Sequence, residues 1–166
     1  MAEIDAGALP AGERWTENKE VSMNLEDLNK CLRGELAAIE TYRQALEKNR
    51  QQYGQEVKYQ QLAEILKDHE EAASQVRSLI QRMGGTPSGD SGAWGAWSKT
   101  VMGTAKLIGD KAALKALKEG EESGVKAYES VAQDPSAPAD TKSVLAGIIT
   151  MEQEHVRELD RLMDAA

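Results

Sequence analysis

The sequence contains no phenylalanine and only one cysteine, Cys31, among its 166 residues. A single cysteine excludes an internal disulfide and suits a reducing compartment. No apolar run approaches the roughly 20 residues that a membrane-spanning helix needs, and residues 1–22 lack the basic start and apolar stretch of a signal peptide. We therefore expect a cytoplasmic protein that does not associate with a membrane.

Positive charge is also scarce, because 20 Lys and Arg stand against 28 Asp and Glu, for a net charge of −8. This balance argues against nucleic acid as a partner, since nucleic acids bind basic surfaces. What the chain has in plenty is Ala, Leu, Glu, Lys and Gln, which favour helices. Its length suits one domain that buries a core without disulfides.

Apolar residues recur at alternating steps of three and four in four segments, which is typical of helices packed in a bundle. The first segment follows Asn24, a good helix N-cap, and residues 1–22, which lack the pattern, are expected to form a flexible tail. The stripes are Leu25, Leu28, Leu32, Glu35, Ile39, Tyr42 and Leu46; Leu62, Ile65, His69, Ala72, Val76, Leu79 and Met83; Leu114, Leu117, Glu121, Val125, Tyr128 and Val131; and Leu145, Ile148, Glu152, His155, Leu159 and Leu162.

Turn signals separate these segments at residues 51–54, 84–87 and 134–138. The connection over residues 84–110 is rich in Gly and Ser but also carries Trp94 and Trp97, which a purely flexible linker would not. We expect a long crossover there, with a short helix packed on the bundle. Short, long and short connections predict an all-α four-helix bundle over residues 23–166.

Five stripe positions carry ionisable side chains where a bundle core normally holds apolar ones: Glu35, His69, Glu121, Glu152 and His155. Burying ionised carboxylates is costly unless something compensates their charge. Protonation, water, a metal ion or a cation could compensate them. Arg33, Lys118 and Arg157 lie beside the stripes and could bend inward.

An internal repeat relates the two halves of the chain by a shift of 86 residues. This shift separates His69 from His155 and Glu35 from Glu121, together with the glycine before each glutamate and the tyrosine seven residues after it. In each half the midpoint between the glutamate and the histidine falls in a turn signal. Folding each half there as a hairpin places all of these side chains in one layer of the bundle, related by a pseudo-twofold axis.

Glu152 and His155 form a Glu-x-x-His motif, which places both side chains on one helix face. Carboxylates and imidazoles that converge from four helices suit a di-iron or di-manganese site, since oxygen donors balance the charge and imidazole caps each metal. The alternative is a polar core network satisfied by water and protonated glutamate. Tyr42 and Tyr128 are predicted to be core aromatics with hydrogen-bonded hydroxyls, and Cys31 a small buried side chain.

This pattern resembles the ferritin-like superfamily, of the bacterioferritin and rubrerythrin type, over about residues 24–164. In that superfamily the first and third helices carry a Glu, and the second and fourth carry Glu-x-x-His. Glu35 and Glu121 match the single acids, and the Glu152 motif matches the fourth helix. His69 matches the second motif only in part, because Leu66 stands where its Glu would be.

A closer likeness is to a bacterial family of uncharacterised ferritin-like bundle proteins. The residues that carry it are Met83-Gly84-Gly85-Thr86-Pro87, Ser91-Gly92, Gly95, Trp97 and Lys99, followed by Lys118-Glu119-Gly120-Glu121 and Ala127-Tyr128-Glu129.

The resemblance implies a metal-binding protein, with iron as the expected ion, most simply as a di-iron centre, and with manganese or zinc as alternatives. For iron it implies oxidation of the ferrous ion by oxygen or peroxide. With Leu66 in place of a glutamate, Glu152 is the one bridging candidate, so the site could hold two ions, one ion or none. Glu64, Asp68 and Glu71 are expected to point to other faces of their helix. The predicted ligands are Glu35, His69, Glu121, Glu152 and His155.

A second hypothesis is a non-enzymatic bundle, used in assembly or stress protection, whose polar core only specifies helix register. A third is a carrier of a redox-inactive ion such as zinc. Metal ions are the expected partners, and we expect a monomer or homodimer because nothing in the sequence marks the faces that build a ferritin cage.

Overall fold

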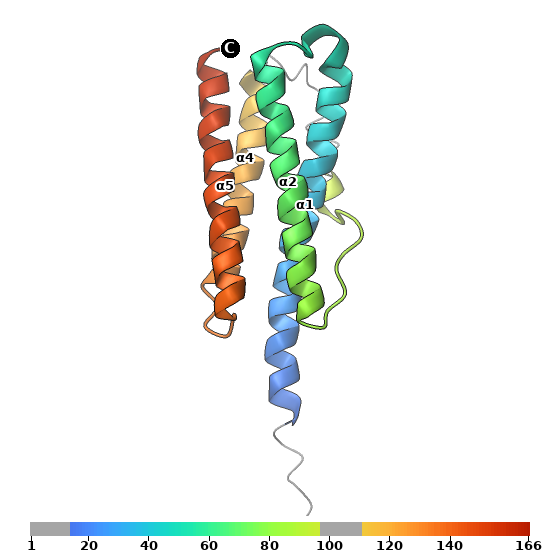
Figure 1. Cartoon of the computed structure of the whole chain (residues 1–166), viewed down its shortest axis with the longest axis vertical. Helices are drawn as coiled ribbons and strands as arrows, with labels where there is room; N and C mark the ends of the chain where they lie inside the picture. The colour runs from blue at the N-terminus through green and yellow to red at the C-terminus, as the bar shows by residue number, and fades with distance from the viewer. Residues whose placement is uncertain (1–13, 97–110) are drawn as a thin grey trace, which may run out of the picture.

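The computed structural model describes the backbone of residues 14–96 and 111–166, and side chains from residue 25 onward within those ranges. This part of the chain forms four long helices that run side by side as a bundle (Figure 1). They are α1 (Arg14–Tyr53), α2 (Val57–Arg82), α4 (Lys111–Ala132) and α5 (Ala139–Asp164). The described ranges contain no strand, so the predicted all-α four-helix bundle is confirmed.

Two helical hairpins, α1–α2 and α4–α5, pack against each other through α1 with α4 and through α2 with α5. Between the hairpins the chain passes from the end of α2 to the start of α4 at the opposite end of the bundle, as a long crossover requires (Figure 1). None of the helices described is long and apolar enough to span a lipid bilayer.

The first part of the crossover is attached to α1 by side-chain hydrogen bonds. The Asn29 amide donates to the carbonyl of Thr86 over 3.1 Å and accepts from the N–H of Ser88 over 2.8 Å, while Arg33 donates to the Ser88 hydroxyl over 3.0 Å. Residues 94–96 form a helical turn. The rest of the short helix expected in the crossover lies outside the described residues, as does Trp97.

The predicted start of the first helix at Asn24 is wrong, because α1 begins at Arg14. Residues 14–22 contain neither Gly nor Pro and include several good helix formers, so the helix can extend through them without an apolar stripe. The tail expected over residues 1–22 is therefore helical from residue 14, and residues 1–13 lie outside the described part of the chain.

The other helix ends follow the predicted turn signals. After α2, the Gly84 N–H donates to Gln81 and the Gly85 N–H to Ile80, which satisfies carbonyls that the helix end leaves free. Gly84 has a φ of 77°, a left-handed conformation that glycine adopts without the strain of a Cβ. Before α5, the Asp134 carboxylate accepts from the Ser136 N–H over 2.8 Å and closes the turn.

The core consists of two apolar clusters with a polar layer between them. One lies toward the end of the bundle that holds the α4–α5 turn and includes Leu28, Leu32, Val76, Leu79, Ile80, Leu145 and Ile148. The other lies toward the α1–α2 turn and includes Leu46, Leu62, Ile65, Leu114, Leu117, Leu159 and Leu162. Each fully buried side chain of this kind contributes about 1.5–3 kcal/mol. These clusters fix the register of the four helices and thereby the heights of the polar side chains between them.

Candidate metal centre

The polar layer consists of the five ionisable side chains that interrupt the apolar stripes. They come from all four helices, and none is more than 5 % exposed: Glu35, His69, Glu121, Glu152 and His155. The structure therefore brings together every predicted site residue, while their role as ligands stays a prediction.

Within each hairpin the glutamate contacts the histidine that the sequence places level with it. His69 Nδ1 lies 2.7 Å from Glu35 Oε2, and His155 Nδ1 lies 3.2 Å from Glu121 Oε2. Both pairs are 34 residues apart along the chain. The repeat predicted from the sequence is thus visible as two equivalent contacts.

Tyrosines link the hairpins with the same symmetry. The Tyr42 hydroxyl donates to Glu121 Oε1 over 2.7 Å, and the Tyr128 hydroxyl donates to Glu35 Oε1 over 2.5 Å. Both rings are buried, and burial followed by the neighbouring carboxylate raises the pKa of each phenol well above its usual value. The prediction of core aromatics with hydrogen-bonded hydroxyls is confirmed, and each hydroxyl remains a donor that holds a carboxylate in place.

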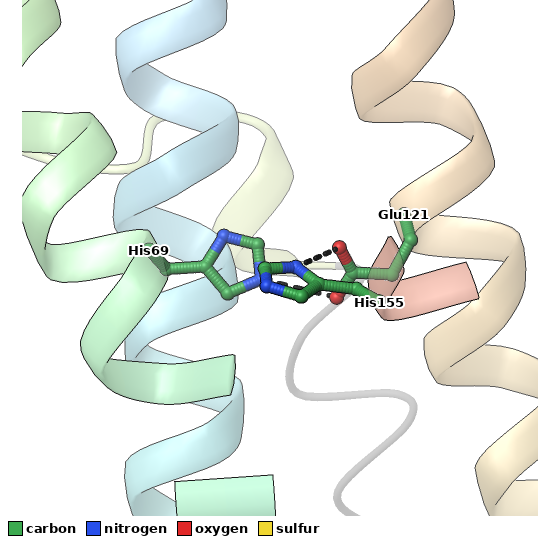
Figure 2. Close-up of side chains that lie close together, drawn as sticks. All are labelled: His69, Glu121 and His155. Atoms are coloured by element: carbon green, nitrogen blue, oxygen red, sulfur yellow. Dashed lines mark hydrogen bonds and ion pairs between the residues drawn. The ribbon is translucent and has the colours of Figure 1, made fainter. Parts of the chain in front are cut away.

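The second ring nitrogens of the histidines break the symmetry. His69 Nε2 lies 3.0 Å from Glu121 Oε1, so the Glu121 carboxylate contacts both imidazoles (Figure 2). His155 Nε2 instead lies 3.1 Å from Asp68 Oδ2. The expectation that Asp68 points away from the site is therefore wrong. Helical spacing puts Asp68 beside the stripe, and α5 packs on that side of α2 and brings His155 within its reach.

In the described part of the chain, no lysine or arginine pairs with the buried carboxylates. Lys118 pairs with Asp160 over 2.6 Å, Arg33 pairs with Glu26 over 2.8 Å, and Arg157 pairs with Glu154. All three cations beside the stripes are thus engaged outside the polar layer.

Protons supply part of the compensation instead. Burial alone would lower the pKa of the His69 imidazole, but the carboxylates of Glu121 and Glu35 outweigh burial and raise it well above its usual value. Conversely, burial would raise the pKa of Glu121, but His69 and His155 outweigh it and hold this pKa far below its usual range. In the metal-free protein His69 is therefore a buried cation between two carboxylates.

Glu152 is the buried acid whose charge the polar layer compensates least. Burial, followed by repulsion from Glu35 and Glu121, raises the pKa of Glu152 to about 10, so this carboxyl group is protonated at neutral pH. Its Oε2 is the one buried side-chain oxygen or nitrogen in the described part of the chain that has no hydrogen-bond partner. A buried polar atom without a partner costs about 1–3 kcal/mol, so it marks a place where a further group would bind favourably.

The donor atoms fall into two overlapping sets, each with atoms within 4.8 Å of one another. The first set is Glu35, His69 and Glu152, and the second is His69, Glu121 and His155. Carboxylate oxygen and imidazole nitrogen together suit iron, manganese and zinc. The residues present therefore fit a divalent metal ion.

A cavity of about 60 Å³ reaches this layer between α1 and α4. Small residues on the two facing helices, including Gly34 and Gly120, leave the space open, and Glu35 and Glu152 are among the lining residues. Exposed Trp94 also lines the cavity, so the space extends toward the surface. It has room for more than one water-sized molecule, and hence for ligands that the protein itself does not supply.

Cys31 lines the same cavity and is 4 % exposed. Burial, followed by the charges of Glu152 and Glu35, raises the pKa of this thiol to about 12. The thiol therefore stays protonated and weakly reactive, which confirms the predicted small buried side chain.

Comparison with known proteins gives a family without an assigned activity. Residues 51–134, just over half of the chain, match a family described as a domain of unknown function (DUF2383). The matched part includes His69 and Glu121, whereas Glu35, Glu152 and His155 lie outside it. No curated protein matches the chain. The family match therefore assigns no chemistry to the polar layer.

Proposed function

Because the chain belongs to the DUF2383 family, a domain of unknown function, we propose its function from its own buried site. The protein is a ferritin-like metal-binding protein in which carboxylates and histidines from four helices hold iron or a related ion. The unpartnered Oε2 of Glu152 carries this proposal, since it is a buried ligand atom to which no described group of the protein binds.

The electrostatics of the layer support the same function. Three carboxyl groups and two imidazoles are buried together, and the described lysines and arginines beside them pair elsewhere. A divalent cation would replace the protons on His69 and Glu152 and neutralise the carboxylates. A metal ion would thus take over the charge compensation that protons provide in the metal-free layer.

Each residue has a distinct role toward the ion. Glu35, Glu121 and Glu152 would supply oxygen ligands, while His69 and His155 would supply nitrogen. Bound iron would supply one-electron redox chemistry, as in the oxidation of ferrous iron by oxygen or peroxide. The two tyrosine hydroxyls keep Glu35 and Glu121 oriented, and the cavity between α1 and α4 admits small molecules to the layer.

A second function has one observation in its favour. Apart from Glu152 Oε2, the buried side-chain polar atoms described all find partners within the protein. A polar layer in which nearly every group is paired could have fixing helix register in a non-enzymatic bundle as its sole role.

Elemental analysis of protein purified without chelator separates the two functions. We expect iron, manganese or zinc above background, a rise in melting temperature when the ion is added, and loss of both in Glu121→Ala and His155→Ala. Glu154→Ala is the matched control, because Glu154 is an exposed acid one residue before His155. Metal at background in every preparation, with an unchanged melting temperature, would favour the register function.

The redox step has its own test. Ferrous iron is added without oxygen, air is admitted, and absorbance in the near ultraviolet is followed. Fast oxidation that the Glu121→Ala variant loses supports an iron oxidase. Bound metal without oxidation, above all bound zinc, indicates a carrier instead.

A further inference from the structure

The two halves of the polar layer differ at two pairs of positions that the 86-residue repeat makes equivalent. Glu152 on α5 corresponds to Leu66 on α2, and Gly124 on α4 corresponds to Ala38 on α1. The carboxylate and the glycine thus occur together in one half, and the leucine and the alanine occur together in the other.

In the half that holds the carboxylate, the glycine makes room for it. A Cβ atom at Gly124 would lie 2.7 Å from Oε2 and 2.9 Å from Oε1 of Glu152. These separations are too short for carbon against oxygen, so any side chain at this position displaces the carboxylate. Gly124 therefore leaves the space that the Glu152 carboxylate occupies, although it offers no ligand atom itself.

The other half is built for apolar packing. Ala38 and Leu66 both pack against the cluster that contains Leu62, Ile65 and Leu117. Neither the Ala38 nor the Leu66 side chain can bind a cation. The repeat therefore supplies three donors in one half of the layer and only two in the other. The complete set is Glu35, His69 and Glu152, and its equivalent is Glu121, His155 and Leu66.

We propose that Gly124 is a positioning residue for Glu152, and that the site consequently binds two ions unequally. The first ion binds tightly through Glu35, His69 and Glu152, and the second binds more weakly through Glu121 and His155. This inference rests on the proposed metal-binding function. It adds an order of binding that the symmetry of the repeat alone would not give.

The two histidines increase the difference in affinity between the two ions. His69 belongs to both sets of donors. When His69 binds the first ion, the second ion therefore loses its third donor. His155 has no such alternative, because its Nε2 is held by Asp68 and only Nδ1 faces Glu121. Loss of a single supporting group commonly changes metal affinity 10- to 100-fold, so we expect the two affinities to differ by about tenfold or more.

Titration of chelator-stripped protein with Co²⁺, followed by calorimetry and visible absorption, tests the inference. We expect one tight ion per chain and a second that binds about tenfold or more weakly. Gly124→Ala should weaken the tight ion by a similar factor and change its Co²⁺ spectrum. The atom that must move is the end of a flexible side chain, so the fold should survive, and alanine is the better helix former.

Gly147→Ala is the matched control, because it makes the same change in an exposed part of α5 where a Cβ meets nothing within 4 Å. The reverse experiment is the double variant Ala38→Gly with Leu66→Glu, which copies the complete half into the incomplete one. We expect it to bring the two affinities within a few-fold of each other, and Leu66→Glu alone to achieve less.

The outcomes separate this inference from the function on which it rests. Two ions of equal affinity in the natural protein, or a tight ion indifferent to Gly124→Ala, would overturn the inference and leave metal binding intact. Absence of Co²⁺ binding in the natural protein and in all variants would overturn the proposed function.

Discussion

His69 Nδ1 lies 2.7 Å from Glu35 Oε2, and both side chains are almost completely buried. The other ring nitrogen faces Glu121 at 3.0 Å, so the imidazole is a cation between two acids. A second proton is held by Glu152, whose pKa is raised to about 10. The metal-free layer therefore stores protons that the unfolded chain would not hold at neutral pH, and its stability must depend on pH.

The stability of the metal-free protein should fall as the pH rises from 7 toward 10. The pKa values of His69 and Glu152 are both raised by folding, so their stabilising contributions are complete below the unfolded values and are lost as pH rises through the folded ones. Each extra proton held by the folded state changes stability by about 1.4 kcal/mol per pH unit. Urea unfolding with chelator at pH 7, 8 and 9 measures the slope.

Replacing Glu152, the protonated glutamate, measures how much it contributes to the dependence of stability on pH. Glu152→Gln keeps the shape and removes the proton, so the stability of the variant should fall less steeply above pH 7. Glu154→Gln, at an exposed position on the same helix, should keep the natural slope. A slope that is the same in all three proteins would contradict the assignment of the stored proton to Glu152.

Lowering the pH should also destabilise the metal-free protein, in this case through Glu121. Its pKa is held far below the usual range because His69 and His155 outweigh the effect of burial. The stability that Glu121 contributes is present above its unfolded pKa and is lost as pH falls through the folded one. The loss through Glu152 begins once the pH exceeds the unfolded glutamate value of 4.5, so the two effects together predict maximal metal-free stability near pH 4.5.

Metal binding should release protons near neutral pH. An ion that takes His69 and Glu152 as ligands must displace their protons, so we expect up to two protons per tight ion and an affinity that rises with pH. Calorimetry of Co²⁺ binding in two buffers of different ionisation enthalpy counts the protons released. Equal heats in both buffers would show that the ion does not bind through these two groups.

The two tyrosine hydroxyls should have similar effects, because the repeat makes them equivalent. Tyr42→Phe and Tyr128→Phe each remove a hydrogen bond to a buried carboxylate, at a cost of about 1.5–3 kcal/mol in stability. Tyr59→Phe, at a half-buried tyrosine of α2 outside the polar layer, should cost much less. Denaturant unfolding of the three variants measures the difference, and equal losses would refute the special role of the carboxylate contacts.

The polar layer can be predicted from the sequence because its position depends on local rules. The helical period puts Glu35 and Glu121 on buried stripes, and the hairpin lengths put a histidine level with each. The length of α1 could not be found this way, since residues 14–22 favour a helix without an apolar stripe. Nor could the roles of Asp68 and Gly124, which depend on how far neighbouring helices rotate and how closely they approach.

The contact between Asp68 and His155 predicts an effect on metal binding without a large effect on folding. Asp68 holds the Nε2 side of the ring over 3.1 Å and keeps Nδ1 facing the layer, and its side chain is 43 % exposed. Asp68→Ala should weaken the second Co²⁺ ion about 10- to 100-fold and leave the tight ion nearly unchanged. Glu64→Ala, an exposed acid on the same helix, should leave both ions unchanged.

Closing the cavity between α1 and α4 should slow the reaction with an oxidant while sparing the metal. Gly34 lines this cavity, and a Cβ built there meets nothing within 4 Å, so the side chain of Gly34→Leu can occupy the open space. We expect unchanged Co²⁺ affinity and severalfold slower iron oxidation by oxygen or peroxide, because neither oxidant reaches the carboxylates freely.

Gly147→Leu separates this effect from the gain in helix propensity. It gives the same improvement on α5, about 0.5–1 kcal/mol, at an exposed position that does not line the cavity. Both variants should therefore melt at or above the natural temperature, and only Gly34→Leu should oxidise iron slowly. Equal oxidation rates in the two variants would mean that small molecules reach the layer by another path, such as the α2–α5 side where Asp68 is half exposed.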